Sequence, residues 1–150
     1  LSTREFLFDN IVACRTVEDI HTLFRAEASD YWSTHYVPSR ATTEQPKRLG
    51  HFKANLLGIN LVVPMIFSYG NYMSDMPMKE RAVDLLDKIN CEDNRIVNGW
   101  RAGGVPMESA FDSQAILQLN NEYCMKRGCW RCPIGKRFIH EVWRDNSGRH

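Results

Sequence analysis

Residues 49–69 read LGHFKANLLGINLVVPMIFSY, and this stretch decides the fold. Its apolar side chains recur at helical spacing on one face, at Leu49, Phe52, Leu56, Ile59, Val63 and Phe67. A second face is also apolar, so we predict a central helix that other elements surround. Pro64 removes the hydrogen bond to the carbonyl of Asn60 and is expected to kink this helix.

The most apolar part of the stretch is too short to cross a membrane. It runs from Leu56 to Tyr69, which is 14 residues, whereas a bilayer-spanning helix needs roughly 20. We therefore interpret it as a buried core helix and expect no membrane partner.

Helix-start and helix-stop signals recur along the rest of the chain. Starts are predicted at Ser2–Glu5, Thr16–Asp19, Pro77, Ser109–Asp112 and Pro133. Stops are predicted at Gly103-Gly104 and at Gly128, the latter as a left-handed residue. Residues 37–47 are the most loop-like stretch of the first half.

Together these signals predict an all-α fold, a single-domain bundle of about seven or eight helices around the Pro-kinked central helix. The domain spans residues 1–150, with 144–150 as a frayed polar tail. The last helix, which opens at Pro133, is expected to face the core with Ile134, Phe138, Ile139 and Val142.

Length and composition fit one folded domain. With 150 residues, of which 43% are hydrophobic, the chain can bury a core without disulfides or metals. Its charged fraction of 25% and aromatic fraction of 11% exclude intrinsic disorder as the overall state. The net charge of +1 produces no global field that would attract nucleic acid or an anionic membrane.

The N-terminus and the cysteine usage indicate the compartment. No apolar signal-peptide region follows Leu1-Ser2-Thr3, and a start without Met suggests a piece of a longer protein. Five Cys is an odd number, which fits a closed disulfide framework poorly. We therefore expect reduced thiols or a metal site in a cytoplasmic protein.

Three of the cysteines lie within nine residues near the C-terminus. Cys124, Cys129 and Cys132 form a C-x4-C-x2-C pattern across a helix stop and a helix start. The spacing suits the opening ligand set of plant-type iron–sulfur proteins and also a Cys-rich zinc site. Either metal takes four protein ligands in a closed site, so one ligand would have to come from elsewhere. The candidates for it are Cys14, Cys91, His21, His35 and His51.

The same three thiols have two other interpretations. Residues 124–150 carry seven Lys or Arg and two acids, a net charge of +5, whereas residues 1–123 have a net charge of −4. Nearby cations lower the pKa of a thiol and favour the thiolate that redox chemistry needs. Cys129 and Cys132 form a C-x-x-C, but the β-α-β pattern of thioredoxin-like proteins is missing. The remaining alternative is three ordinary reduced thiols in a basic corner.

Other polar and aromatic residues favour structural roles. Asp112 is expected to cap a helix on which Gln114 and Glu122 also lie, and His35 is expected to bond to backbone. A basic, aromatic group that could contact nucleic acid consists of Lys126, Arg127, Trp130 and Arg131. The sequence has no phosphate-cradling Gly-rich loop, no nucleophile elbow and no H-E-x-x-H motif.

Four segments resemble successive motifs of an uncharacterised bacterial protein family. They are EASDYWSTHY (27–36), NLVVPMIFSYG (60–70), AFDSQAILQLNNEYC (110–124) and CWRCPIG (129–135). Members of that family are longer, and this chain resembles their C-terminal part, whereas their N-terminal part resembles a PD-(D/E)XK nuclease core. The resemblance implies a domain of unknown function with a nuclease-like N-terminal region as its partner, and it implies no mechanism.

The leading hypothesis is a non-catalytic helical accessory or interaction domain of a larger, nucleic-acid-processing protein, with no catalytic residue assigned. The nuclease association is an analogy between folds. The alternative is a zinc, iron–sulfur or thiol redox site at Cys124, Cys129 and Cys132. Any contact with nucleic acid is expected to be weak and salt-sensitive, through residues 124–150.

Overall fold

The structure is a computed structural model that describes residues 7–45 and 47–147, with side chains to residue 141. The capping-box pattern predicted at Ser2–Glu5 lies outside the described residues. The chain divides into two compact units. Unit 1 comprises Leu1–Asn90 with Ser109–Phe111, and unit 2 comprises Cys91–Glu108 with Asp112–His150. The single domain expected over residues 1–150 stays a prediction.

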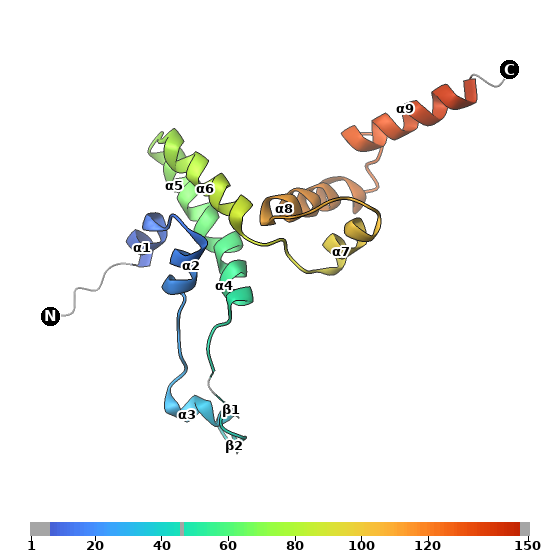
Figure 1. The fold of residues 1–150 in the computed structure, drawn as a ribbon. Helices are drawn as coiled ribbons and strands as arrows, with labels where there is room; N and C mark the ends of the chain where they lie inside the picture. The colour runs from blue at the N-terminus through green and yellow to red at the C-terminus, as the bar shows by residue number, and fades with distance from the viewer. Residues whose placement is uncertain (1–6, 46, 148–150) are drawn as a thin grey trace. The chain divides into compact units, whose positions relative to one another are not determined.

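Helices build both units (Figure 1). Unit 1 contains α1 (Leu7–Ala13), α2 (Val17–Leu23), α3 (Asp30–Ser33), α4 (His51–Leu57), a π-helical turn η1 (Gly58–Val62), α5 (Val63–Tyr72) and α6 (Met76–Lys88), with the short strands β1 (His35–Val37) and β2 (Arg40–Ala41). The remaining elements are α7 (Arg95–Ala102), α8 (Ala110–Leu119), a second π-helical turn η2 (Asn120–Cys124) and α9 (Pro133–Ser147). The all-α fold class is therefore confirmed, with a two-stranded hairpin as the sheet among the described residues.

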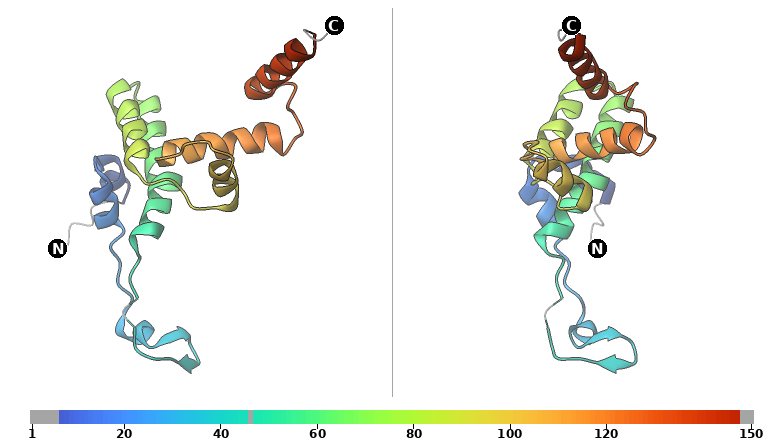
Figure 2. Two further views of the ribbon diagram at one scale, coloured as in Figure 1. Left: turned by 45° about the vertical axis from the view of Figure 1, so that its right-hand side comes forward. Right: turned by 90° about the vertical axis from the view of Figure 1, so that its right-hand side faces the viewer.

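The core of unit 1 forms where α1, α2, η1, α5 and α6 meet. Its buried members are Ile11, Cys14, Ile20, Ile59, Val62, Val63, Ile66, Ala82, Leu85, Ile89 and Ala110. Helices α5 and α6 lie side by side as an antiparallel hairpin in all three views (Figures 1 and 2). The approach is close at Gly70, where an added Cβ would lie 3.1 Å from the Cβ of Met78.

The predicted central helix is present and runs without interruption from His51 to Tyr72. By length and composition, it is the one helix among the described residues that could cross a membrane, a test that core helices of soluble proteins also pass. Ile59 and Val63 of the predicted face lie in the core of unit 1, so the predicted core helix is confirmed in part. The prediction that other elements surround this helix is wrong, because Phe52 and Phe67 of the same face are 58% and 41% exposed.

The expected kink takes a different form from the one predicted at Pro64. The distortion is the π-helical turn η1 in the preceding five residues, where the Val63 N–H donates to the carbonyl of Gly58. Pro64 then occupies the first turn of α5, where a missing N–H is tolerated. Asn60 contributes as well, because its Nδ2 donates to the carbonyl of Leu56 at 2.9 Å.

The segment between α2 and α4, residues 24–50, forms an arm of unit 1 that contains α3 and the hairpin (Figure 2). Its two chain segments pair at Glu27 and Arg48, whose side chains form an ion pair of 3.0 Å. The strands fall partly within residues 37–47, which were expected to be a loop. Strands of three and two residues are too short to display an alternating pattern in the sequence.

Two predictions for unit 2 are wrong. The described side chains of α9 are not buried, and Ile134, Phe138 and Ile139 are 56%, 68% and 43% exposed. An amphipathic pattern shows that a helix has an apolar face, but it does not say what covers that face. The left-handed residue after η2 is Arg127 (φ 50°), not Gly128. By contrast, the stop predicted at Gly103-Gly104 is confirmed, with Gly104 at φ 86°.

Helix α9 extends to Ser147. It therefore includes residues 144–147, which the sequence predicted to be part of a frayed tail. Residues 148–150 lie outside the described part of the chain.

Candidate functional site

The three clustered cysteines lie along the turn between η2 and α9. Cys124 is the last residue of η2, Cys129 follows in the turn, and Cys132 directly precedes α9, as the sequence predicted. Cys124 and Cys129 are exposed, whereas Cys132 is buried. All five cysteines are free thiols.

The turn that holds Cys129 is closely packed against the first turn of α9. The N–H groups of Arg131 and Cys132 both donate to the carbonyl of Gly128. A Cβ added to Gly135 would lie 2.2 Å from the carbonyl oxygen of Cys129, far inside van der Waals contact. Glycine is therefore required at residue 135 of the CWRCPIG segment.

The structure does not assemble the three thiols into a ligand set. Among the described residues, no group of three or more His, Cys, Asp or Glu side chains is placed to hold a metal ion. Two of the proposed fourth ligands, His21 and His51, belong to unit 1, whereas the three cysteines belong to unit 2. The metal site at Cys124, Cys129 and Cys132 stays a prediction.

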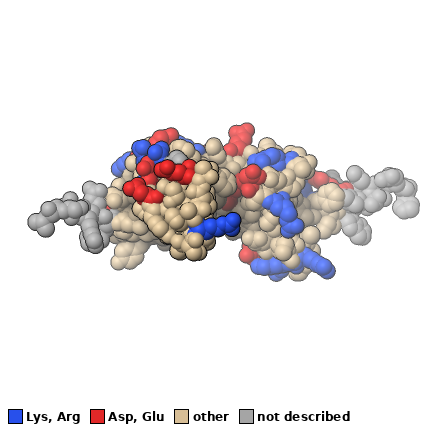
Figure 3. Space-filling model, turned by 90° about the horizontal axis from the view of Figure 1, so that it is seen from below, with Lys and Arg blue, Asp and Glu red and all other residues tan. Residues whose placement is uncertain are grey.

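The basic, aromatic group predicted near the C-terminus is exposed. The Trp130 side chain is 68% exposed, and the Arg131 guanidinium lies 5.2 Å from the centre of its ring. Lys126 bridges to Glu122 at 2.7 Å, and this cation lowers the pKa of the Glu122 carboxyl. On the face seen in Figure 3, basic and acidic side chains are interspersed, in keeping with the net charge of +1.

Three other predicted candidates have local partners. His35 Nδ1 lies 2.9 Å from the carbonyl of Tyr31, and the two rings stack, so His35 bonds to backbone as expected, within the arm. Asp112 accepts from the backbone N–H of Glu108, next to the start of α8. Gln114 donates to the carboxylate of Glu92 at 2.6 Å.

Unit 1 contains a cavity that the sequence did not indicate. Its volume is about 390 Å³, and it lies between the end of α2, the arm and the start of α4. The lining residues are Glu18, His21, Thr22, Arg25, Ala26, Glu27, Arg48, Leu49, His51 and Ala54. The cavity therefore gathers two histidines, two carboxylates and two arginines.

His21 and His51 meet directly in this cavity. Their Nδ1 atoms are 2.8 Å apart, and the ring centres are 4.3 Å apart at an angle of 76°. His21 Nε2 lies 2.7 Å from Oδ1 of Asn55. An amide oxygen only accepts, so His21 carries its proton on Nε2 and directs the Nδ1 lone pair at His51. No local sequence pattern indicates this pair, because 30 residues separate the two histidines.

The N-terminal side of α2 contains a second polar arrangement. The predicted start at Thr16 is confirmed as a capping box with Asp19. Asp19 accepts from the backbone N–H groups of Arg15 and Thr16, and these bonds lower the pKa of its carboxyl. We assign this arrangement to the stability of α2.

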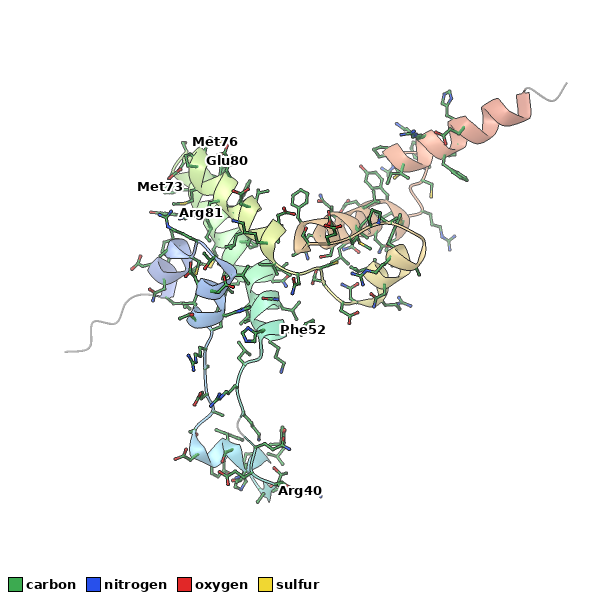
Figure 4. The ribbon with its side chains drawn as sticks, in the orientation of Figure 1. Arg40, Phe52, Met73, Met76, Glu80 and Arg81 are labelled. Carbon is green, nitrogen blue, oxygen red and sulfur yellow. The ribbon has the colours of Figure 1, made fainter. Side chains whose placement is uncertain are left out.

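Burial and a cation shape the surroundings of Cys14 in the core of unit 1. Burial raises the pKa of the Cys14 thiol, which donates to the carbonyl of Asn10. Arg81, labelled in Figure 4, donates to the carbonyl of Val12 at 2.8 Å. A neutral, buried thiol is a structural group rather than a nucleophile.

The comparisons with known proteins agree with the division of the chain. No curated protein and no solved structure matches the chain. A family model with the description "Protein of unknown function (DUF2851)" matches residues 1–95, which is more than half of the chain and nearly all of unit 1. This confirms the resemblance to a family of unknown function over residues 1–95. The resemblance of segments 110–124 and 129–135 and the nuclease-like N-terminal region stay predictions. The chain thus belongs to the DUF2851 family.

Proposed function

We propose that this chain is a non-catalytic interaction domain of a longer cytoplasmic protein and that α9 is the helix through which it binds. The observation that carries the proposal is the exposed apolar face of α9, formed by Ile134, Phe138 and Ile139. These residues are spaced i, i+4 and i+5 and therefore share one side of the helix. Amphipathic helices of this kind dock into apolar grooves through such anchors.

The partner we propose is the nuclease-like N-terminal region that the sequence resemblance predicts for the longer protein. Burying a Phe or Ile side chain contributes roughly 1.5–3 kcal/mol. Free association costs several kcal/mol, but covalent linkage within one chain reduces that cost. Three anchors are therefore sufficient for a contact within one protein, and the +5 charge of residues 124–150 favours an acidic rim around it.

The test compares amide hydrogen exchange of residues 133–141 in the full-length protein and in the 150-residue chain. We expect slower exchange in the full-length protein. Phe138→Ser in the full-length protein should restore fast exchange, because it removes the central anchor. Lys136→Ser is the matched control, since residue 136 lies on the opposite side of the same helix and is exposed.

Equal exchange of α9 in the two proteins would overturn the proposal. So would slow exchange that Phe138→Ser and Lys136→Ser change to the same extent. Light scattering on the 150-residue chain separates a third outcome, because dimerisation through α9 would make a second copy, not the N-terminal region, the partner.

We also propose that the chain binds nucleic acid weakly. Trp130 and its basic neighbours lie in the +5 segment, and exposed rings beside cations bind single strands by stacking and charge. We expect weak binding of a single-stranded oligonucleotide that disappears as salt is raised. Tight binding that survives high salt would contradict this expectation.

The alternative function is a zinc, iron–sulfur or thiol redox site at Cys124, Cys129 and Cys132. Its support is the C-x4-C-x2-C spacing and the tight turn that Gly135 allows at Cys129. Elemental analysis of protein purified with and without air tests it. Visible absorption would indicate iron–sulfur, and colourless protein with stoichiometric zinc would indicate a structural zinc site.

A further inference from the structure

We infer that His21 and His51 form a binding site for a divalent transition-metal ion in unit 1, separate from the clustered cysteines. The two side chains come from different helices, α2 and α4, and meet in a cavity of about 390 Å³. Imidazole nitrogens are preferred ligands of zinc, copper, nickel and cobalt. The inference is independent of the interaction proposed for α9.

The distance between the two Nδ1 atoms is somewhat shorter than the distance between two nitrogen ligands of one metal ion. Zn–N bonds are about 2.0–2.1 Å, so two nitrogens on a tetrahedral zinc lie about 3.4 Å apart. The two Nδ1 atoms here are 2.8 Å apart, so a small separation of the rings would admit the ion. His51 is exposed, which allows solvent to carry its proton from Nδ1 to Nε2 as the metal binds.

Asn55 supplies the outer contact that metal-binding histidines need. Its Oδ1 lies 2.7 Å from His21 Nε2, on the side of the ring away from His51. Metal-binding histidines generally donate their second ring N–H to such an acceptor, which fixes the tautomer and the ring orientation. Asn55 and His51 both lie on α4, so one helix positions a ligand and the support of the other ligand.

The two histidines are the ligands that the structure brings together, because no third His, Cys, Asp or Glu side chain among the described residues is placed to join them on a metal ion. Glu18 is a carboxylate that adds negative charge near the pair. It lines the same cavity and lies three residues before His21 on α2, so the two residues share one face of the helix. Glu27 also lines the cavity but already pairs with Arg48. Water would complete the coordination, which makes this an open site of modest affinity.

The charges around the cavity are balanced. Arg25 and Arg48 also line it, and they oppose a dication, whereas Glu18 and Glu27 favour one. Because these charges offset one another, the two histidines determine which metal ions the site selects. Hard cations such as Mg²⁺ and Ca²⁺ prefer sites made of oxygen ligands, so we expect them to bind poorly here.

The experiment titrates the untagged chain with Co²⁺, followed by visible absorption, and with Zn²⁺, followed by calorimetry. Cobalt spectra separate nitrogen and oxygen ligands from thiolates, because thiolate ligands add an intense near-ultraviolet band. We expect one equivalent of Co²⁺ without that band. His21→Ala and His51→Ala should each weaken binding by at least about tenfold, and Asn55→Leu should do so by about 10–100-fold.

The matched control is His35→Ala, which removes a histidine of the arm that bonds to the carbonyl of Tyr31. Circular dichroism checks that each variant is folded. If His51→Ala does not fold, His51→Gln replaces it in the titration. Wild-type affinity in the His51 variant would overturn the inference. So would a spectrum with thiolate bands only, or no binding at millimolar metal.

Discussion

The two units of this chain use their apolar residues in different ways. In unit 1, five helical elements share one core, and Ile20, Val62 and Ile66 are fully buried. In unit 2, the side chains of α9 described between Pro133 and Glu141 include none that is buried. The family match ends at residue 95, close to the end of the main segment of unit 1.

The difference shows that an amphipathic pattern has two possible uses. Within unit 1, helices cover one another's apolar faces, and stability is internal. On α9, a pattern of the same kind leaves Ile134, Phe138 and Ile139 exposed. Exposed apolar faces on single helices are typical of binding surfaces. We therefore assign stability to unit 1 and interaction to α9, and the predictions below test this assignment.

The largest effect is expected from Ile66→Ala in the core of unit 1. Ile66 is fully buried, and such truncations cost about 2–5 kcal/mol. The control is Phe67→Ala on the next residue of α5, whose side chain is 41% exposed. Urea denaturation should show a much lower midpoint for Ile66→Ala than for Phe67→Ala. Equal midpoints would mean that unit 1 does not hold the stability of the chain.

A smaller effect, confined to unit 2, is expected from Gly135→Ala. The new Cβ would collide with the carbonyl of Cys129, and overpacking of this kind costs about 1–3 kcal/mol. The control is Gly99→Ala on α7, where an added Cβ meets nothing within 4 Å. Hydrogen exchange should accelerate around residues 129–141 while unit 1 keeps its protection. Loss of protection in unit 1 would show that the units do not unfold separately.

Much of the fold could be predicted because the relevant signals are local. Helical spacing identified the central helix, Thr16 and Asp19 marked the start of α2, and Gly104 marked the end of α7. The exposure of α9 could not be predicted, because burial depends on contacts between elements distant in sequence. The π-helical turn also escaped prediction, since Pro64 marks a distortion without fixing its form.

The candidate site was less predictable than the fold. The cysteine spacing was visible in the sequence, but whether thiols converge depends on the turn between η2 and α9, and no ligand set forms there among the described residues. The contact between His21 and His51 had no local signal, because it requires the arm to return α4 to the end of α2. In the sequence, both histidines were candidates only for the fourth ligand of the clustered cysteines.

A still smaller effect, again confined to unit 2, is expected when Cys129→Ser and Cys132→Ser are combined. The chain should stay folded, because the core of unit 1 contains neither residue. Hydrogen exchange should become faster within about residues 124–143, since Cys132 is buried beside the start of α9. Global unfolding would mean that this turn supports the whole chain. Unchanged exchange and melting in metal-free protein would mean that both thiols are inert.

The smallest effect is expected on the pH dependence of stability, for which we compare one carboxylate from each unit, Asp19 and Glu122. The pKa of Asp19 is lowered by backbone N–H groups at the start of α2, so its stabilisation is present above its unfolded pKa of about 3.9 and is lost as the pH falls through the lower folded value. Because Asp19 is exposed, Asp19→Asn should cost only about 0.5 kcal/mol at pH 6, and the difference from wild type should vanish at low pH.

Glu122 in unit 2 also has a lowered pKa, but its partner is the flexible ammonium of Lys126 rather than a fixed helix terminus. We therefore expect Glu122→Gln to leave the melting temperature unchanged at every pH, whereas Asp19→Asn lowers it near neutrality. Thermal melts of both variants from pH 3 to pH 7 make the comparison. An equal response of the two variants would mean that the helix start at Thr16 contributes no more to stability than a surface ion pair.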